Sequence, residues 1–456
     1  MRDHKTDEMH TPDIEELMGK SFECPECGRI HSMDTRKLII GEGLFGDISR
    51  EIDELGLKGK GLIICDRNTY KAAGCRLIEN LADRDVSLFV FEREDLHADA
   101  HSVGRLMIAM ADDPAYLIAC GSGTITDTVR YVAFLTKKPF IVFATAASVD
   151  GFASGSTPLI VDGFKTTYPG KAPLAVLADT EVLAAAPRKM TAAGFGDVLA
   201  KIVAVIDWKL ARDVDGEPFC PLICRMVEKA VDDCISLSGE LAKADPQACG
   251  KLMRVLSMTG IAMQMMGTTR PASGGEHHIS HLLEMKDIRL GRRGSLHGDK
   301  VGIGTLISLY MYREMFGAHS MPEQRGHLSE KAWTEEIRRV YGDMAQRAIS
   351  INDSCPPDGE VWGEQKKIIE KSMSEYGYAY LDKYCGMIGE FASMIRAMGG
   401  PVLAGELGYD RQDLYDAIAF SKEVRPKFTV LRIAERFGRL YELASEIAAD
   451  PEIVLR

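Results

Sequence analysis

The hydrophobic pattern of the chain changes near residue 187, and this change limits the folds that the sequence can adopt. Before that point, short apolar runs such as GLIICDRNTY, VSLFVFERED and KPFIVFATAAS alternate with segments of helical period. Such alternation predicts a parallel sheet with crossover helices. After that point the helical period dominates, as in VLAKIVAVIDWKLA, and no segment is typical of a strand. We therefore expect an N-terminal α/β domain followed by an all-α C-terminal domain.

The chain has 456 residues, which is too long for one core of ordinary size. We place an extension at 1–35, the α/β domain at 36–187 and the helical domain at 188–456. The net charge of −12 argues against a nucleic-acid surface. The longest apolar run, FIVFATAASV, is half of the ~20 residues that span a membrane, so no membrane span is expected.

The N-terminus and the cysteine content bear on the cellular compartment. MRDHKTDEMHTPD is charged and has no apolar core, so it is not typical of a secretory signal. Eleven cysteines without a regular spacing favour reduced thiols and a cytoplasmic protein.

The segment ACGSGTITD is a candidate phosphate-binding turn between a strand and a helix. Gly121 and Gly123 let the backbone approach a ligand closely, and the free N–H groups of a helix that starts at Thr124 are donors. Residue 126 is Thr, so the G-x-G-x-x-G fingerprint is absent and an ordinary tight turn is the alternative.

Two aspartates follow other predicted strands. Asp66 ends the LIICD run, where a carboxylate can accept hydrogen bonds from ribose hydroxyls or cap a helix. Asp150 is the only charged residue of TAASVDGFAS, a loop beyond a strand's carboxyl end, where open α/β sheets bind ligands. Asp150 alone is equally typical of a turn.

The segment SGGEHHISH contains three histidines in five positions. On a helix, His277 and His281 share one face, whereas His278 points about a quarter-turn away. Two ligands do not make a metal site, and further ones must come from elsewhere.

Asp197 in GFGDVLAK and His297 in LHGDK are the further candidates. Asp197 is expected near the start of the first long helix, where it can be an N-cap or a metal ligand. Together with His277, these residues would make a three-ligand site with open positions, which is typical of a catalytic metal.

The sequence also resembles a known family. Its motifs occur in the family's order: GSGTITD, TAASVDGFAS, GFKTTYPGKAPLAVLADTEVLAAAP, AAGFGDVLAK, SGGEHHISH and LHGDKVGIGT. Together they resemble the bacterial sn-glycerol-1-phosphate dehydrogenases, relatives of glycerol dehydrogenase, iron-containing alcohol dehydrogenases and 3-dehydroquinate synthase. The resemblance covers roughly residues 36–440, including SKEVRPKFTVLRI. It implies the dehydroquinate synthase-like fold, a Rossmann-like α/β domain followed by helices.

The resemblance implies roles for individual residues. The residues expected to bind NAD or NADP are Asp66, Gly121, Ser122, Gly123, Thr124, Ile125, Thr145, Ser148 and Ser154. Asp197, His277 and His297 are expected to bind one divalent metal ion, zinc or nickel, or else iron. Asp150, Asp197 and His281 are expected at the substrate, and His278 has no role. Asp66, if it contacts the ribose, would repel a 2′-phosphate and favour NAD.

The implied reaction is the reversible reduction of dihydroxyacetone phosphate to sn-glycerol 1-phosphate for phospholipid synthesis, by a homodimer. Lys165 and Lys171 in GFKTTYPGK resemble two phosphate-binding lysines of dehydroquinate synthase, and solvated loop lysines are the alternative. Other functions left open are a glycerol or polyol dehydrogenase and a dehydroquinate synthase-like lyase. A sensor of metal or nucleotide is a further alternative, which the complete set of Asp197, His277 and His297 disfavours.

The extension departs from the family pattern. CPECGRIH places His31 four positions after Cys27, which with Cys24 forms half of a zinc ribbon. No second C-x2-C follows, although CPLIC over 220–224 supplies two cysteines far along the chain. A structural zinc site and a loop with two reduced thiols both remain open.

Overall fold

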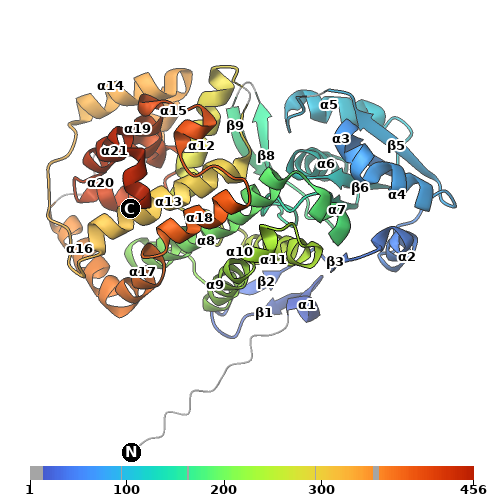
Figure 1. The fold of residues 1–456 in the computed structure, drawn as a ribbon, viewed down its shortest axis with the longest axis horizontal. Coiled ribbons are helices and arrows are strands. Elements are labelled where there is room, and N and C mark those ends of the chain that lie inside the picture. The colour runs from blue at the N-terminus through green and yellow to red at the C-terminus, as the bar shows by residue number, and fades with distance from the viewer. Residues whose placement is uncertain (1–13, 94, 162–163, 293, 353–358) are drawn as a thin grey trace, which may run out of the picture.

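The computed structural model describes residues 14–93, 95–161, 164–292, 294–352 and 359–456. Figure 1 shows a sheet with helices in the first half of the chain and a helical body formed by the second half. The two halves lie side by side. This arrangement confirms the fold class predicted from the sequence.

Six parallel strands form the main sheet, in the order β3-β10-β7-β6-β4-β5. Their bounds are β3 (Lys37–Gly41), β4 (Gly61–Asp66), β5 (Val86–Phe91), β6 (Tyr116–Gly121), β7 (Phe140–Ala144) and β10 (Ala175–Asp179). In the register of β6 and β7, Gly121 lies opposite Ala144. The loops that follow these central strands therefore start side by side at the carboxyl edge of the sheet.

Alternate residues of the strands pack against different helical layers, as the two-residue period of a strand requires. Ile63 of β4 packs with Ile52 of α2 (Ile48–Glu54) and Leu77 of α4 (Cys75–Asn80). Ile64 packs on the other face with Val129 of α6 (Gly123–Thr136). The sheet is therefore buried on both faces, which explains why its strands are continuous apolar runs.

Besides the short hairpin of the N-terminal extension, three strands were not anticipated from the sequence. β10 is rich in Ala and Leu, which favour helix, so the run AVLAD carries little strand signal. β8 (Ser156–Val161) and β9 (Phe164–Pro169) form an antiparallel hairpin between the sheet and the helical half. The strands expected around residues 36–45, 61–70, 86–95, 115–121 and 138–148 are all present.

In the part of the chain that the structure describes after residue 187, every regular element is helical. The α-helices are α8 (Arg188–Asp215), α9 (Pro221–Ser236), α10 (Ser238–Leu241), α11 (Pro246–Met266), α12 (Gly275–Arg289), α13 (His297–Phe316), α14 (Glu330–Tyr341), α15 (Ala345–Ser350), α16 (Gly359–Ser372), α17 (Tyr378–Cys385), α18 (Ile388–Ala397), α19 (Arg411–Phe420), α20 (Val430–Arg436) and α21 (Leu440–Ala449).

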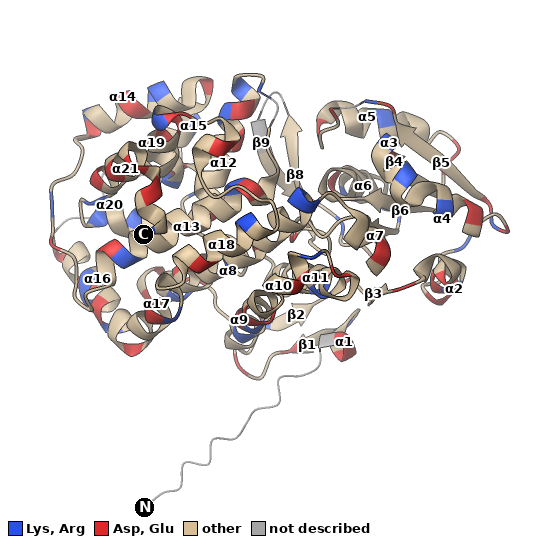
Figure 2. Ribbon diagram, in the orientation of Figure 1, with Lys and Arg blue, Asp and Glu red and all other residues tan. Residues whose placement is uncertain are grey.

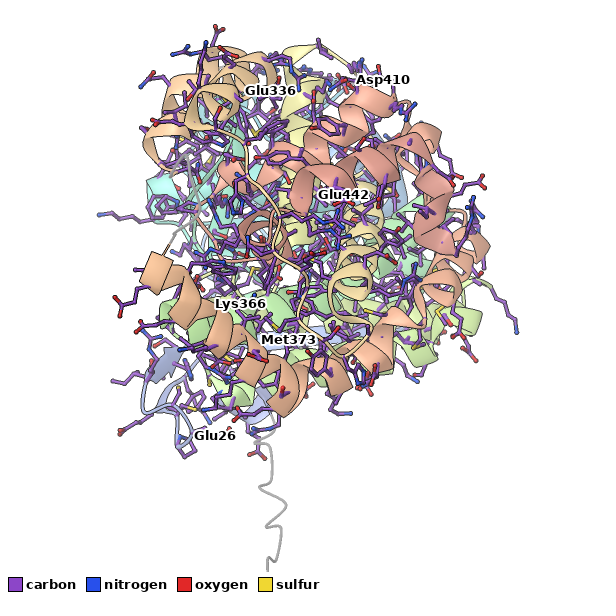
Figure 3. The ribbon with its side chains drawn as sticks, turned by 90° about the vertical axis from the view of Figure 1, so that its left-hand side faces the viewer. Glu26, Glu336, Lys366, Met373, Asp410 and Glu442 are labelled. Carbon is purple, nitrogen blue, oxygen red and sulfur yellow. The ribbon has the colours of Figure 1, made fainter. Side chains whose placement is uncertain are left out.

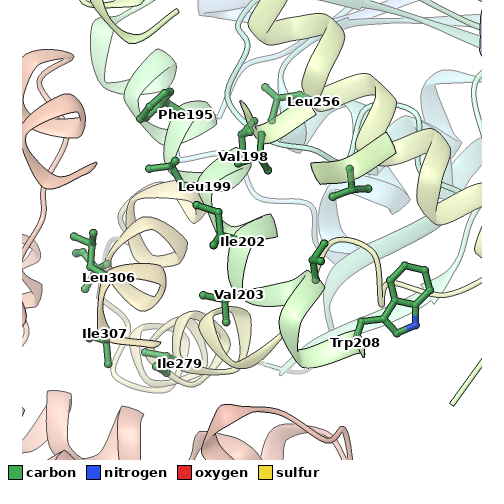
Figure 4. Close-up of a cluster of buried hydrophobic side chains, with 14 of the residues drawn as sticks. Phe195, Val198, Leu199, Ile202, Val203, Trp208, Leu256, Ile279, Leu306 and Ile307 are labelled. Atoms are coloured by element: carbon green, nitrogen blue, oxygen red, sulfur yellow. The ribbon is translucent and has the colours of Figure 1, made fainter. Parts of the chain in front are cut away.

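Helix α8 is the centre of the helical half. Its side chains are buried on all sides from Thr191 to Trp208, which is typical of a core helix. Figure 4 shows Val198, Ile202 and Leu306 in the apolar cluster that α8 shares with α11, α12 and α13. The charged residues of this stretch, Asp197, Lys201 and Asp207, are therefore enclosed by tightly packed side chains.

Glycines let α8 approach its neighbours closely. A Cβ atom at Gly194 would overlap the carbonyl oxygen of Ala147, in the loop that follows β7. A Cβ atom at Gly298 of α13 would overlap the carbonyl oxygen of Ala193. These contacts bring the loop after β7, α8 and the start of α13 together around one point.

We predict that Gly194→Ala lowers the free energy of unfolding by about 1–3 kcal/mol, because α8 or the loop must move to admit a methyl group. Urea denaturation measures the change. The matched control is Gly239→Ala, where a Cβ atom would meet nothing within 4 Å. Equal stability of the two variants would contradict the close packing of α8 against the loop.

The N-terminal extension includes α1 (Ile14–Leu17) and a hairpin of β1 (Ser21–Glu23) and β2 (Ile30–Ser32). Residues 1–13 of the extension lie outside the described residues. Among the described helices, none is long and apolar enough to cross a membrane. Basic and acidic residues are interspersed over both halves (Figure 2).

Candidate active site between the sheet and the helical half

A cavity of about 1060 Å³ lies between the carboxyl edge of the sheet and the helical half. The sheet side contributes Ser122 and Thr145 to its lining, and the helical side contributes His277, His281 and His297. Open α/β sheets bind ligands at this edge. The cavity therefore joins the two groups of candidate residues that the sequence suggested.

The turn between β6 and α6 presents a helix N-terminus to this cavity. Ser122 is the N-cap, and Gly123, Thr124 and Ile125 of the first turn line the cavity. Gly121 does not line it, since it lies beneath the turn, where a Cβ atom would come within 2.7 Å of Ile125. The unpaired N–H groups of this first turn can bind an anionic group such as a pyrophosphate.

The loop after β7 runs beside this turn. The N–H of Thr145 donates to the carbonyl of Gly121 at 3.2 Å, and the hydroxyls of Ser122 and Ser148 are 2.6 Å apart. Ser148 and Ser154 also line the cavity. The predicted cofactor residues of the two loops are thus adjacent.

Asp66 caps the short helix α3 (Arg67–Thr69). One of its carboxylate oxygens, Oδ1, accepts hydrogen bonds from the N–H groups of Asn68 and Thr69, both at 2.8 Å. The capping alternative from the sequence is therefore correct. Asp66 also lines the cavity, so capping does not remove it from reach of a bound nucleotide.

Asp197 is not an N-cap, contrary to one of the two expectations from the sequence. Helix α8 begins at Arg188, upstream of the apolar run, and places Asp197 in its third turn with no exposed surface. The glycines around Asp197 suggested a helix start, but they serve the close packing of α8.

Lys201 lies between the two aspartates of the site. Its ammonium is 2.6 Å from Oδ2 of Asp150 and 2.9 Å from Oδ1 of Asp197, and all three side chains are buried. Burial and the nearby charge of Asp197 raise the pKa of Asp150. Burial alone would lower the pKa of Lys201, but the two carboxylates raise it, so Lys201 stays protonated and balances part of their charge.

Asp197, His277 and His297 come together from α8, α12 and the first residue of α13. One ligand atom from each lies within 4.8 Å of the others. Nε2 of His277 is 3.7 Å from Oδ1 of Asp197, and the rings of His277 and His297 are 5.4 Å apart between centroids. These atoms can converge on a single metal ion.

Carboxylates orient both imidazoles. Nδ1 of His277 lies 2.7 Å from Oε1 of Glu276, and Nδ1 of His297 lies 2.8 Å from Oε1 of Glu284. With Nδ1 held in this way, Nε2 of each ring is the ligating atom, as in many metal sites. Burial and the cation of Lys201 hold the pKa of His277 well below its usual value, so this ring is neutral and able to bind a metal.

The other two histidines of the segment differ. His281 lines the cavity, and its Nδ1 is 3.2 Å from Oε2 of Glu284. His281, Glu284 and His297 can also group around an ion, but both oxygens of Glu284 are already bound to imidazole nitrogens. His278 is buried away from the cavity, and neither of its ring nitrogens has a hydrogen-bond partner among the described residues.

Sequence reasoning did not single out several residues of this site. Lys201 carries a detectable signal, since it lies four positions after Asp197 on the same helix face. Arg130 carries none: it is buried and donates to the carbonyls of Gly151 and Phe152, which fixes the loop that contains Asp150.

Of the two candidate phosphate lysines, the structure tests only Lys171. Lys171 does not line it, because its ammonium donates to the carbonyl of Lys137 at 3.1 Å. The side chain of Lys165 lies outside the described residues. Arg425 does line the cavity, and its guanidinium donates to the hydroxyl of Thr167 at 2.7 Å.

Lys427 lies close to Arg425, behind residues that line the cavity. Its ammonium donates to the hydroxyl of Thr269 at 2.9 Å and to the carbonyl of Ser273 at 3.3 Å, two residues that line the cavity. No carboxylate of a described residue pairs with Arg425 or Lys427 within 4.0 Å. Burial and the cations of Arg270 and Arg425 lower the pKa of Lys427 to about 7. Two cations without a carboxylate partner can hold an anion.

Comparisons with known proteins agree with this architecture. A family model described as iron-containing alcohol dehydrogenase matches residues 39–187. A protein of Bacillus licheniformis named glycerol-1-phosphate dehydrogenase [NAD(P)+] is 34% identical, over 94% of this chain and 96% of its own length. A protein of the same name from Bacillus subtilis is 34% identical, over 82% of this chain and 84% of its own length. The crystal structure of a probable glycerol dehydrogenase from Sinorhizobium meliloti aligns with a TM-score of 0.59 at 16% identity, covering 91% of this chain and 98% of that one.

Proposed function

The chain belongs to the glycerol-1-phosphate dehydrogenase family, and on this basis we propose that it reduces dihydroxyacetone phosphate reversibly to sn-glycerol 1-phosphate, using NAD(P)H. The resemblance stated from the sequence motifs is thereby confirmed. The product is a backbone for glycerophospholipids. One observation supports the proposal above all: His277 and His297, which meet the buried Asp197 as candidate metal ligands, line the same cavity as a free helix N-terminus.

The described residues fit a divalent metal ion. Asp197, His277 and His297 would hold it. The buried carboxylates of Glu276 and Glu284 fix the orientation of the two imidazoles. Mixed nitrogen and oxygen ligands suit zinc, nickel or iron. When bound, such an ion supplies Lewis-acid polarisation of the substrate carbonyl.

The nicotinamide cofactor supplies the hydride, and the protein's task is to orient it. The first turn of α6 would bind the pyrophosphate through its N–H groups, with Thr145, Ser148 and Ser154 beside it. The loop after β7 continues to the candidate metal site, where the N–H of Asp150 donates to Oδ2 of Asp197 at 3.0 Å, so the nicotinamide end of the cofactor would point toward the histidines.

The remaining residues would position the substrate and a proton. Arg425 would contact the phosphate at the cavity wall, and Lys427, whose ammonium binds Thr269 and Ser273 of that wall, would add a second positive charge. Asp150, held by Lys201, would contact the substrate hydroxyl. His281 would hold the proton for the substrate oxygen, with its ring oriented by Glu284.

The test is an assay of NADH oxidation on purified protein, together with elemental analysis of its metal. Oxidation with dihydroxyacetone phosphate, and much slower oxidation with dihydroxyacetone, is the expected result. Equal rates on both would favour a polyol dehydrogenase. Substrate turnover without net NADH oxidation would favour a lyase.

We expect Asp66→Ser to narrow the preference for NADH over NADPH by about tenfold, mainly through KM, because the charge that repels a 2′-phosphate is lost. Serine can still cap α3, so the variant removes the charge while keeping the helix start. The ratio of kcat/KM for the two cofactors is the measurement. An unchanged ratio would show that Asp66 only caps the helix.

The proposal extends to the assembly and the compartment. None of the ten cysteines of the described residues forms a disulfide, which supports a reducing cytoplasm. We infer a homodimer from the family resemblance, and sedimentation analysis of the full chain tests this state.

A further inference from the structure

A second cluster of metal-ligating side chains lies outside the cavity, where the N-terminal extension meets the helical half. Cys24, Cys27 and His31 come from the β1–β2 hairpin, and Cys220 comes from the N-cap of α9. One ligand atom from each of the four lies within 4.8 Å of the others. Cys220 is thus the missing fourth partner of the half-ribbon motif.

The distances between these atoms match a tetrahedral site. With Zn–S near 2.3 Å and Zn–N near 2.05 Å, tetrahedral geometry gives about 3.8 Å between two sulfurs and about 3.6 Å between nitrogen and sulfur. The sulfurs of Cys24 and Cys220 are 3.7 Å apart. Nε2 of His31 is 3.3 Å from the sulfurs of both Cys27 and Cys220. A disulfide would need about 2.05 Å between sulfurs.

The imidazole of His31 is oriented for ligation. Its Nδ1 lies 2.7 Å from the carbonyl oxygen of Met265, at the end of α11, and must donate its proton there. Nε2 then carries the lone pair, and it faces the sulfurs. A backbone carbonyl on the remote nitrogen is a usual partner of metal-bound histidine.

The cysteine turn has the conformation that a metal-binding C-x2-C needs. Gly28, with φ of 67°, lets the chain reverse directly after Cys27, and its N–H donates to the carbonyl of Cys24 at 2.9 Å. This turn leaves the sulfur atoms of Cys24 and Cys27 in the same cluster of ligand atoms.

The remaining groups leave no place for an external ligand. His31 is 1% exposed and Cys220 is 0% exposed. Glu26, on the outer face of the turn (Figure 3), is ion-paired with Arg225 of α9 and does not join the cluster. Four protein ligands and no open position are typical of a structural zinc site, not a catalytic one.

We propose that Cys24, Cys27, His31 and Cys220 bind one structural Zn²⁺ ion, which fastens the extension to α9 and α11. The chain continues from this site into β3 through Thr35, whose hydroxyl donates to the carbonyl of Pro173 at 2.8 Å. The ion would therefore also hold the edge strand β3 in place beside β10. This site is separate from the one proposed for catalysis and differs from it in its thiolate ligands.

The experiment is cobalt substitution of the full-length protein, with elemental analysis of the same samples. Thiolate ligands give Co²⁺ an intense sulfur-to-metal charge-transfer band, whereas the nitrogen and oxygen ligands of the catalytic site give none. We expect the band in the wild type and in His277→Ala. We expect Cys27→Ser to lose it together with one zinc per chain. The matched control Cys75→Ser, a half-buried cysteine outside the cluster, should keep both.

The wild-type spectrum decides the question even if Cys27→Ser does not fold. This cluster is the only candidate metal group with sulfur ligands among the described residues. A wild type without the band, or a Cys27→Ser protein that keeps it, would overturn the proposal and leave hydrogen-bonded thiols at this position. Loss of one metal ion per chain from His277→Ala with the band retained would separate the catalytic ion from the structural one.

Discussion

Replacing His277 or His297 by Ala should strip most of the catalytic metal and lower kcat by more than a hundredfold. Each change removes one of three protein ligands. Loss of a group that only hydrogen-bonds to a metal ligand already lowers metal affinity or activity by about 10–100-fold. Elemental analysis and the NADH oxidation assay measure the two effects. NADH binding, followed by fluorescence titration, should persist, since α6 and the turn before it contribute none of the three ligands.

Two neighbouring histidines are the controls for this result. His281→Ala leaves all three ligands in place, so it should keep most of the metal while losing turnover. His278→Ala should change neither, because that ring is buried away from the cavity. If His278→Ala strips the metal and His277→Ala keeps it, the ligand assignment is wrong by one position. If no variant loses metal, the three-ligand site does not exist.

The layers of the fold could be predicted from the sequence because burial on both sides of a parallel sheet leaves a continuous apolar run. β4 and β6 show this clearly, since nearly every residue in them is buried. β10 was not predicted because its Ala and Leu residues have little strand propensity. Pairing with β3 and β7 is what makes this segment a strand. The change to helical period near residue 187 coincides with the start of α8.

From the sequence, we could predict only those residues of the candidate site that belong to a recognisable local motif. His277 and His297 lie beside glycines in short, unusual segments, so each motif drew attention by itself. The pairing of Lys201 with Asp150 depends on the contact between α8 and the loop after β7, which no local pattern specifies. Cys220 is even less predictable, because it meets Cys24 across 196 positions of sequence. The surrounding CPLIC offered a cysteine but no indication of its partner.

Replacing Lys427 by Met should lower kcat/KM for dihydroxyacetone phosphate by roughly thirtyfold or more. The expected cost of removing one buried charge partner of the phosphate is about 2 kcal/mol or more. The activity with dihydroxyacetone, which has no phosphate, should be nearly unchanged, and so should the metal content. The matched control is Lys171→Met, because the ammonium of Lys171 binds a backbone carbonyl outside the cavity. If Lys171→Met lowers kcat/KM and Lys427→Met does not, the phosphate instead binds at the GFKTTYPGK segment.

The same lysine should control the pH dependence of the reaction. Its pKa is lowered to about 7 by burial and by Arg270 and Arg425, so the free protein loses this positive charge as the pH rises through 7. We therefore expect kcat/KM for dihydroxyacetone phosphate, which reports the free enzyme, to fall above about pH 7. Bound phosphate favours the protonated ammonium, so the fall in kcat should come at higher pH. Lys427→Arg keeps its charge, because a guanidinium does not deprotonate in this range, and should shift the fall in kcat/KM to higher pH. A profile that is identical in the wild type and in Lys427→Arg would show that Lys427 is not the titrating group.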